Sequence, residues 1–203
     1  MNNSIYLARR ITLKSVKGTE TEKNLLAAFA GESQARNRYT FFAEKAEEEG
    51  YIQIANIFHE TAYNEKVHAQ RYFSFLEGGD VEISAGYPAG IVGSTLDNLK
   101  AGAAGENMEH TKIYPEMAEV AQKEGFPEVA AAYKNIAAVE AWHEKRYNKL
   151  IENVTKGFVF KRDGKVFWKC INCGRVIEAT EPPKTCPTCL FPQAWFQIYD
   201  EAF

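Results

Sequence analysis

The sequence has no long apolar run, no cysteine before residue 170 and no excess of either charge. No apolar stretch approaches the roughly 20 residues that a membrane helix needs, and no segment has the pattern of a secretory signal peptide. The formal net charge is only −3, which argues against a broad surface for nucleic acid or for lipid. Apolar residues make up 45% of the chain, so what remains is an ordinary globular composition.

Acidic residues are also absent from the first 19 residues, where Arg9, Arg10, Lys14 and Lys17 are basic. We interpret residues 1–18 as a basic N-terminal arm on a cytoplasmic protein. An acid-poor start that contains arginine also occurs in organellar transit sequences. Import into a mitochondrion-related organelle is therefore the alternative location.

Helical periodicity dominates from Thr19 onward. Thr19-x-x-Glu22 is typical of a capping box, and Pro127 suits the first turn of a helix. Glycines punctuate the pattern, and residues 78–94 are rich enough in glycine and proline to predict a long connection. The spacing predicts four helices, over about 19–49, 51–76, 94–125 and 127–154.

The second pair of helices repeats the first. Glu106 answers to Glu32 with an offset of 106 − 32 = 74, and Glu140 answers to Glu65 with an offset of 140 − 65 = 75. Two helical hairpins joined by one long crossover form the ferritin-like four-helix bundle. The slip of one residue predicts a π-bulge or a kink between Glu106 and Glu124, with Pro115 as a second cause.

The pattern changes after residue 156. Residues 158–160, 166–168 and 195–199 are short β-like runs between glycine and proline turns. We therefore expect a mainly α protein, with a bundle over residues 19–156 and a small β-rich metal domain over residues 157–203. A domain this small usually needs a staple, and a bound metal would supply it.

The repeat places acidic and histidine side chains on every helix of the bundle. Residues three apart share one helical face, so a Glu-x-x-His pair can reach a single point in the interior. Solvated surface charge is the plain alternative, but two such pairs lie in matching halves, at 65 − 32 = 33 and 140 − 106 = 34 residues from a Gly-Glu. Glutamate with neutral imidazole suits iron or manganese. The candidate ligands are Glu32, Glu65, His68, Glu106, Glu109, Glu140 and His143.

Four cysteines form two Cys-x-x-Cys pairs in the small domain, Cys170 with Cys173 and Cys186 with Cys189. The pairs are separated by 186 − 173 − 1 = 12 residues, which indicates one tetrahedral site and a reducing compartment. Spacing alone does not distinguish iron from zinc, because both accept four thiolates.

Several stretches resemble the rubrerythrin family, and the likeness runs from about residue 17 to the C-terminus. They are AFAGESQARNRY at 28–39, FLEGGD at 75–80, PAG at 88–90 and HEKR at 143–146. The cysteine segment resembles rubredoxin, except that Leu190 stands where free rubredoxins usually have glycine. The resemblance implies a di-iron site in the bundle and one iron in the four-cysteine site, although zinc remains possible there.

Position by position, the resemblance implies that the seven candidate residues are iron ligands, with Glu65 and Glu140 as bridges. It implies that one iron takes His68 when reduced and Glu109 when oxidised, and that Tyr39 and Tyr114 orient the ligands. His59 should be exposed, since it faces away from His68, and the family pattern has no ligand at His110.

The implied activity is an oxidoreductase that reduces hydrogen peroxide to water in oxidative-stress defence. Electrons would come from a reduced pyridine nucleotide through a separate donor, either rubredoxin or a flavoprotein reductase, and pass through the chain's own rubredoxin-like iron. The resemblance also implies a homodimer. The alternative is a ferritin-like ferroxidase or iron-handling protein with a structural zinc ribbon.

Overall fold

The structure is a computed structural model that describes residues 14–200. Most of the predicted N-terminal arm therefore lies outside the described residues. The described part of the arm, residues 14–18, lies against the bundle, where Val16 is buried and Lys14 Nζ donates to Glu124 O at 2.7 Å. Within residues 14–200, no helix combines the length and the apolarity needed to cross a membrane.

The four predicted helices are confirmed, the third of them in three pieces. They are α1 (Glu20–Glu48), α2 (Ile52–Phe73), α3 (Thr95–Met108) with the π-helix η2 (Glu109–Ile113) and α4 (Tyr114–Lys123), and α5 (Pro127–Thr155). The Thr19 side chain accepts from Glu22 N as predicted, but the Glu22 carboxylate accepts from Gly18 N, one residue earlier than in a standard capping box.

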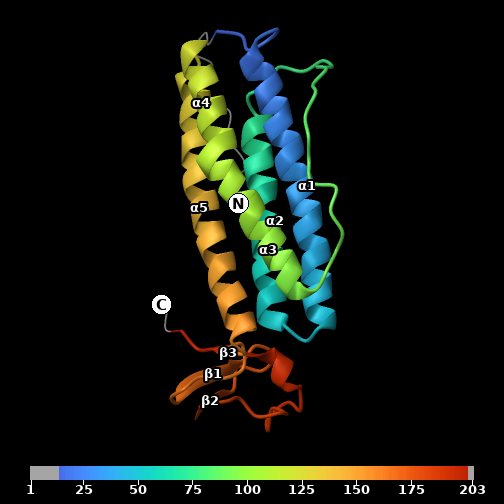
Figure 1. The fold of residues 1–203 in the computed structure, drawn as a ribbon, viewed down its shortest axis with the longest axis vertical. Helices are drawn as coiled ribbons and strands as arrows, with labels where there is room; N and C mark the ends of the chain where they lie inside the picture. The colour runs from blue at the N-terminus through green and yellow to red at the C-terminus, as the bar shows by residue number, and fades with distance from the viewer. Residues whose placement is uncertain (1–13, 201–203) are drawn as a thin grey trace, which may run out of the picture.

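Two helical hairpins pack side by side, α1 with α2 and the α3–α4 helix with α5 (Figure 1). The crossover between α2 and α3 runs along the outside of α1 (Figure 1), where Tyr87 Oη donates to Ala27 O at 2.8 Å. This connection makes α2 and α5 antiparallel neighbours, bridged by Arg146, which donates to Glu60 at 2.7 Å and to Thr61 at 2.8 Å.

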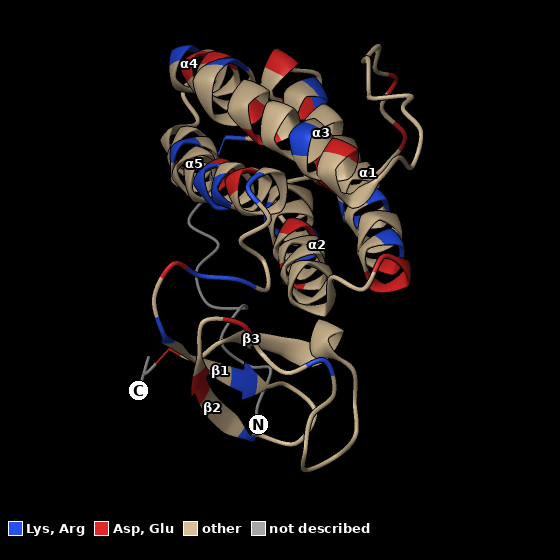
Figure 2. Cartoon of the chain, turned by 60° about the horizontal axis from the view of Figure 1, so that its bottom comes forward, with Lys and Arg blue, Asp and Glu red and all other residues tan. Residues whose placement is uncertain are grey.

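Two apolar clusters fill the bundle. One surrounds Tyr39, Phe58 and Tyr147 towards the small domain, and the other surrounds Tyr114 and Tyr133 towards the far end. The buried carboxylates described below lie between the two clusters. Both signs of charge are interspersed along every helix of the bundle (Figure 2).

The predicted π-bulge is confirmed at η2. Five residues wind as a π-turn between two α-helical segments. A π-turn contains one residue more than an α-turn, and this additional residue accounts for the change in the repeat offset from 74 to 75. Pro115 follows at the start of α4, where its missing N–H removes one helical hydrogen bond. With the π-turn between them, Glu106 before it and Tyr114 after it are both buried.

The small domain is a three-stranded antiparallel sheet in the order β2-β1-β3. Its strands are β1 (Val166–Cys170), β2 (Val176–Ala179) and β3 (Phe196–Ile198), with the short helix η3 (Gln193–Trp195) before β3. The runs predicted at 166–168 and 195–199 are thus largely confirmed in β1 and β3. Trp168 and Phe196 form its core with Cys170 and Cys186.

The strand predicted at 158–160 is wrong. Val159 is buried in the bundle's apolar cluster, and the Phe160 ring stacks against Tyr51 with centroids 6.2 Å apart. These apolar side chains therefore pack the end of the bundle rather than a sheet. The small domain lies against this same end (Figure 1), where β3 and η3 contact α2.

Candidate metal centres

Four glutamates and two histidines converge in the interior of the bundle. All six are buried, and the four carboxylates are at most 1% exposed. Burying a charge is costly unless it is paired or binds a metal. The six residues come from four helices: Glu32 from α1, Glu65 and His68 from α2, Glu106 from α3, and Glu140 and His143 from α5.

The first group of ligand atoms surrounds His68. Its Nδ1 lies 2.9 Å from Glu140 Oε1, 3.0 Å from Glu65 Oε2 and 3.8 Å from Glu32 Oε2. These four side chains present one nitrogen and three oxygens within 4.8 Å of one another. That donor set and spacing suit one hard cation.

The second group surrounds His143 and shares two members with the first. His143 Nδ1 lies 2.7 Å from Glu140 Oε2, 3.3 Å from Glu65 Oε1 and 3.7 Å from Glu106 Oε2. Glu65 and Glu140 therefore each turn one oxygen toward His68 and the other toward His143. This is the arrangement of two carboxylates that bridge a pair of ions.

The electrostatics of the cluster fit a pair of cations. Six inward-facing atoms contact a histidine or a carboxylate of the cluster but have no hydrogen bond of normal geometry within the described part of the chain: Glu32 Oε2, Glu65 Oε1, Glu106 Oε2, both oxygens of Glu140, and His143 Nδ1. Burial raises the pKa of Glu106 to about 8, and the carboxylates of Glu65 and Glu140 add to the rise. Burial would also raise the pKa of Glu65, but His143 and His68 lower it to about 2. Two bound cations would satisfy every one of these atoms.

Two buried tyrosines hold the unshared carboxylates. Tyr39 Oη donates to Glu106 Oε1 at 2.6 Å, and Tyr114 Oη donates to Glu32 Oε1. Each of these glutamates thus turns one oxygen to a tyrosine and the other to a histidine. The sequence predicted both tyrosines, but not that each would bond to a glutamate of the other half of the repeat.

Glu109 is the one candidate that the structure leaves outside both groups. It is the first residue of η2 and is half-buried. Burial raises the pKa of its carboxyl, and the nearby carboxylates of Glu32 and Glu106 raise it further. The Glu109 side chain is therefore close enough to these carboxylates to be affected by their charge, while His68 is the residue within the ligand group.

Sequence reasoning missed a further partner of the site. Asn64 Oδ1 lies 3.3 Å from His143 Nε2, the ring nitrogen that faces away from the carboxylates. Such contacts orient a ligating imidazole. In the sequence, the only signal for Asn64 is its position next to Glu65, because its partner His143 lies on another helix. The other two histidines behave as predicted: His59 is exposed, and His110 turns away from the carboxylates toward Glu144.

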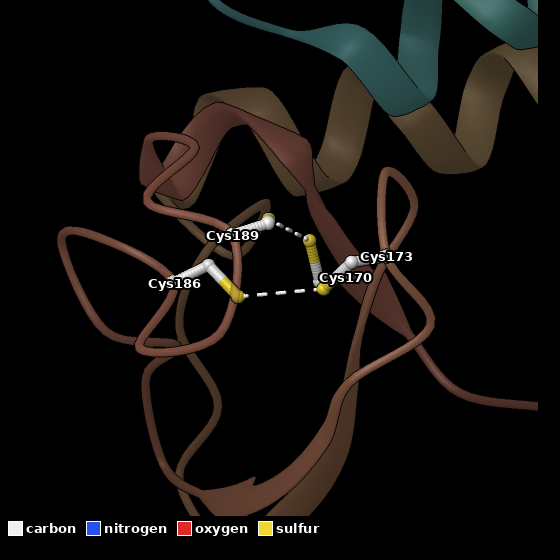
Figure 3. A group of neighbouring side chains, drawn as sticks. All are labelled: Cys170, Cys173, Cys186 and Cys189. Carbon is white, nitrogen blue, oxygen red and sulfur yellow. Dashed lines mark hydrogen bonds between the residues drawn. The ribbon is translucent and has the colours of Figure 1, made fainter.

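The four cysteines face one another in the small domain, Cys170 from the end of β1 and the other three from turns (Figure 3). Cys170 Sγ lies 3.7 Å from Cys189 Sγ, and Cys173 Sγ lies 3.7 Å from Cys186 Sγ. These are free thiols rather than disulfides. A tetrahedron with metal–sulfur bonds of about 2.3 Å has edges of about 3.8 Å, so the cluster has the size of a tetrathiolate site.

The two cysteine turns have the same backbone design. Gly174 N donates to Cys170 O at 2.8 Å, and Leu190 N donates to Cys186 O at 3.0 Å. Both Gly174 (φ 77°) and Leu190 (φ 63°) adopt the left-handed conformation. The turn at Leu190 therefore has the same shape as the turn at Gly174, although Leu190 is not glycine. A residue with a side chain is less stable than glycine in the left-handed backbone conformation.

Together, the bundle with its paired ligand groups and the cysteine domain define a two-domain non-haem iron protein. It carries a carboxylate-bridged di-iron site in a ferritin-like bundle and a four-cysteine, rubredoxin-like site. The family described as rubrerythrin matches residues 23–151, and the rubredoxin-like domain of rubrerythrin matches residues 168–197. The chain belongs to the rubrerythrin family.

Individual relatives agree with this placement. The chain is 59% identical to a rubrerythrin of Porphyromonas gingivalis over 91% of its length and 92% of that protein's. It is 50% identical to a rubrerythrin of Nitratidesulfovibrio vulgaris over 92% of its length and 97% of that protein's. Among solved structures, fully reduced nigerythrin aligns with a TM-score of 0.60 at 30% identity, covering 92% of each chain.

Proposed function

We propose that this protein is a peroxidase that reduces hydrogen peroxide to water, with electrons relayed through its own four-cysteine iron, in defence against oxidative stress. The observation that carries the proposal is the pair of buried ligand groups that share Glu65 and Glu140, combined with a tetrathiolate site in the same chain. The balanced reaction takes one hydrogen peroxide, two electrons and two protons to two waters.

The chain's own residues have distinct roles in this proposal. Glu32, Glu65, His68, Glu106, Glu140 and His143 bind the pair of irons, and Cys170, Cys173, Cys186 and Cys189 bind the third. When bound, the iron pair supplies the two electrons and the Lewis acidity that cleavage of the O–O bond requires. Tyr39 and Tyr114 each keep a proton at hydrogen-bond distance from a ligating carboxylate, so we assign them to proton delivery.

We further propose that His68 and Glu109 exchange as ligands. His68 lies among the carboxylates and Glu109 lies outside them, and in this proposal that arrangement would belong to the reduced site. A carboxylate adds negative charge and a harder donor, so replacing His68 by Glu109 favours the ferric state.

The layout of the chain supports a homodimer with electron transfer between subunits. Helix α2 begins at Ile52, at the end of the bundle that meets the small domain. Glu65 lies 13 residues further along this helix, which corresponds to a distance of roughly 20 Å along the helix axis. Helices α2 and α5, which form a seam beside His68 and His143, instead expose apolar side chains, including Tyr63 (64% exposed) and Trp142 (66%). We propose that the partner's small domain covers this seam and that its thiolate site reduces the iron pair. Leu190 and Phe191, exposed beside Cys189, are a matching apolar surface.

Electrons would reach the small domain from a separate rubredoxin or flavoprotein reductase that is supplied by a reduced pyridine nucleotide. The free thiols fit a reducing compartment, so we expect the protein in the cytoplasm. The comparisons lend no support to import through the basic N-terminal residues.

Rapid mixing of the anaerobically reduced protein with hydrogen peroxide tests the proposal. Oxidation of the cysteine-bound iron restores its visible colour, and we expect fast recovery with peroxide and much slower recovery with dioxygen. A Cys173→Ser variant should lose this signal while its bundle still takes up iron. A colourless cysteine site that holds zinc would instead support a ferroxidase with a structural zinc ribbon. Colour that recovers no faster with peroxide than with dioxygen would keep the fold and the iron but reject the peroxidase reaction.

A further inference from the structure

His110 and Glu144 form a hydrogen-bonded pair at the outer edge of the metal site. His110 Nε2 lies 2.6 Å from Glu144 Oε2, and the two side chains are only 19% and 23% exposed. His110 directly follows Glu109 on η2, and Glu144 directly follows His143 on α5. The pair thus joins the chain segment of the exchangeable carboxylate to that of a ligating histidine.

Glu144 also binds the segment on the other side of Glu109. Its Oε1 accepts from Asn107 Nδ2 at 3.2 Å, and from Asn148 Nδ2 of its own helix at 3.3 Å. Asn107 and His110 flank Glu109 in the sequence, so a single carboxylate holds both sides of that residue. Hydrogen bonds to a charged group are among the stronger polar contacts in proteins.

Apolar packing does little to hold this stretch. All five residues of η2 keep part of their side chains exposed, and only Ile113, at the far end, packs partly against an apolar cluster. A π-turn is also less favourable than a regular α-turn and persists where function retains it. The polar contacts to Glu144 are therefore the main tie between the start of η2 and α5.

The internal repeat shows that this arrangement is confined to one half of the bundle. With the offsets 109 − 74 = 35 and 110 − 74 = 36, Ala35 and Arg36 correspond to Glu109 and His110. With 144 − 75 = 69, Ala69 corresponds to Glu144. The first half accordingly has no carboxylate at the position of Glu109 and no His–Glu pair at the positions of His110 and Glu144, and its helix α1 is α-helical throughout. Glu109, the π-turn η2 and the His110–Glu144 pair are therefore all additions to the second half, and they lie at the same place in the bundle.

We propose that His110 and Glu144 are positioning residues, which clamp the first turn of η2 to α5 and fix the point from which Glu109 reaches the metal site. This inference rests on the proposed exchange of His68 for Glu109. With the backbone held, the exchange is a side-chain rotation of Glu109 against a fixed helix. Without the clamp, η2 shifts and Glu109 binds the oxidised site less well.

The first test is amide hydrogen exchange at residues 106–114 in the metal-free chain. His110→Ala and Glu144→Ala should each speed exchange there roughly tenfold, as expected for loss of a charged hydrogen bond, and the double variant should add little. His110→Gln, which keeps an N–H donor, should restore slow exchange. His59→Ala is the matched control, because it removes an exposed His–Glu pair on α1 and α2. Unchanged exchange in His110→Ala would overturn the clamp.

The second test is the reduction potential of the iron pair in the loaded protein. A tenfold weaker preference for the oxidised form raises a one-electron potential by about 59 mV. We expect this rise in His110→Ala and its reversal in His110→Gln. Faster exchange with an unchanged potential would show a purely structural pair and reject the positioning role. A chain without a redox-active iron pair would refute the proposed function, while the exchange experiment would still decide the clamp.

Discussion

At the scale of single residues, the buried glutamates are of two kinds. Glu65 and Glu140 direct both oxygens to metal-binding groups, whereas Glu32 and Glu106 give one oxygen to a tyrosine. Within residues 14–200, neither shared glutamate has an oxygen that is used outside the two ligand groups. Losing one of them removes an oxygen from both ligand groups at once.

Changing a shared glutamate should cost more than changing an unshared one. We expect Glu140→Gln to abolish tight binding of both bundle ions, because each group loses a charged oxygen. Glu32→Gln should mainly weaken the group around His68. Anaerobic titration with ferrous or cobaltous ions, monitored by calorimetry, measures both. Equal losses in the two variants would contradict the sharing of Glu140.

Removing a tyrosine hydroxyl isolates the orienting hydrogen bond from the packing of the ring. Tyr39→Phe and Tyr114→Phe should each lower metal affinity or the rate with peroxide by roughly 10–100-fold, as for other partners of metal ligands. Tyr133→Phe is the matched control, since its hydroxyl is buried without a hydrogen-bond partner among residues 14–200. Comparable losses in all three variants would point to packing rather than hydrogen bonding.

Six of the seven candidate ligands were predictable as a converging set because they repeat at a nearly fixed offset and share helical faces, whereas Glu109 has no counterpart in the first half and lies outside both groups. The sequence did not predict Asn64 or Glu144, whose partners His143 and His110 lie on other helices. Contacts between helices depend on how the helices rotate against one another, and periodicity on one helix does not contain that information. The pairing of each tyrosine with the opposite half escaped prediction for the same reason.

At the scale of secondary-structure elements, the ends of helices are tied to one another. The Glu124 carboxylate, after the end of α4, accepts from Glu20 N, Thr21 N and Thr21 Oγ1 at the start of α1. These are donors that a helix N-terminus leaves unpaired. Hydrogen bonds from Thr21 lower the pKa of Glu124, so its ionised form stabilises the folded chain.

The contribution of Glu124 should depend on pH. Its folded-state pKa is below the ordinary value of about 4.3, so its stabilisation is complete above that pH and is lost as the pH falls through the folded pKa. Glu124→Ala should destabilise the protein by about 1–2 kcal/mol at neutral pH and by less in acid. Thermal unfolding against pH measures this. Glu119→Ala, which removes an exposed glutamate paired with Lys123, should show no comparable trend.

Elements were predictable where a pattern was long. The four helices follow from periodicity, and the π-turn follows from one residue of slip between two halves of a repeat. The strands are three to five residues long, too short for alternation to be distinctive. Residues 158–160 illustrate this, because an apolar run that packs the bundle end has the same composition as a strand.

At the scale of the whole molecule, the two metal sites lie far apart within one chain. An assembly in which a second chain covers the α2–α5 seam removes that separation. Trp142→Glu should therefore weaken association by about 2 kcal/mol, or roughly 30-fold, and slow reoxidation of the cysteine-bound iron by peroxide. Sedimentation and rapid mixing measure the two effects. Phe41→Glu, at an exposed aromatic residue on α1, is the control, and an equal effect there would argue against the seam.

The crossover along α1 divides the ligands as well as the helices. Glu32, Glu65 and His68 precede it, and Glu106, Glu140 and His143 follow it. A cut in this exposed connection, for instance after Ala85, would leave two helical hairpins, each with an apolar face and half of a metal site. Such fragments would be expected to reassemble most strongly in the presence of iron, because the ligands of both fragments are needed to bind it. The bound metal would then hold the two hairpins together in place of the cut peptide bond. The bundle is thus organised like a dimer of two helical hairpins, although both hairpins belong to a single polypeptide.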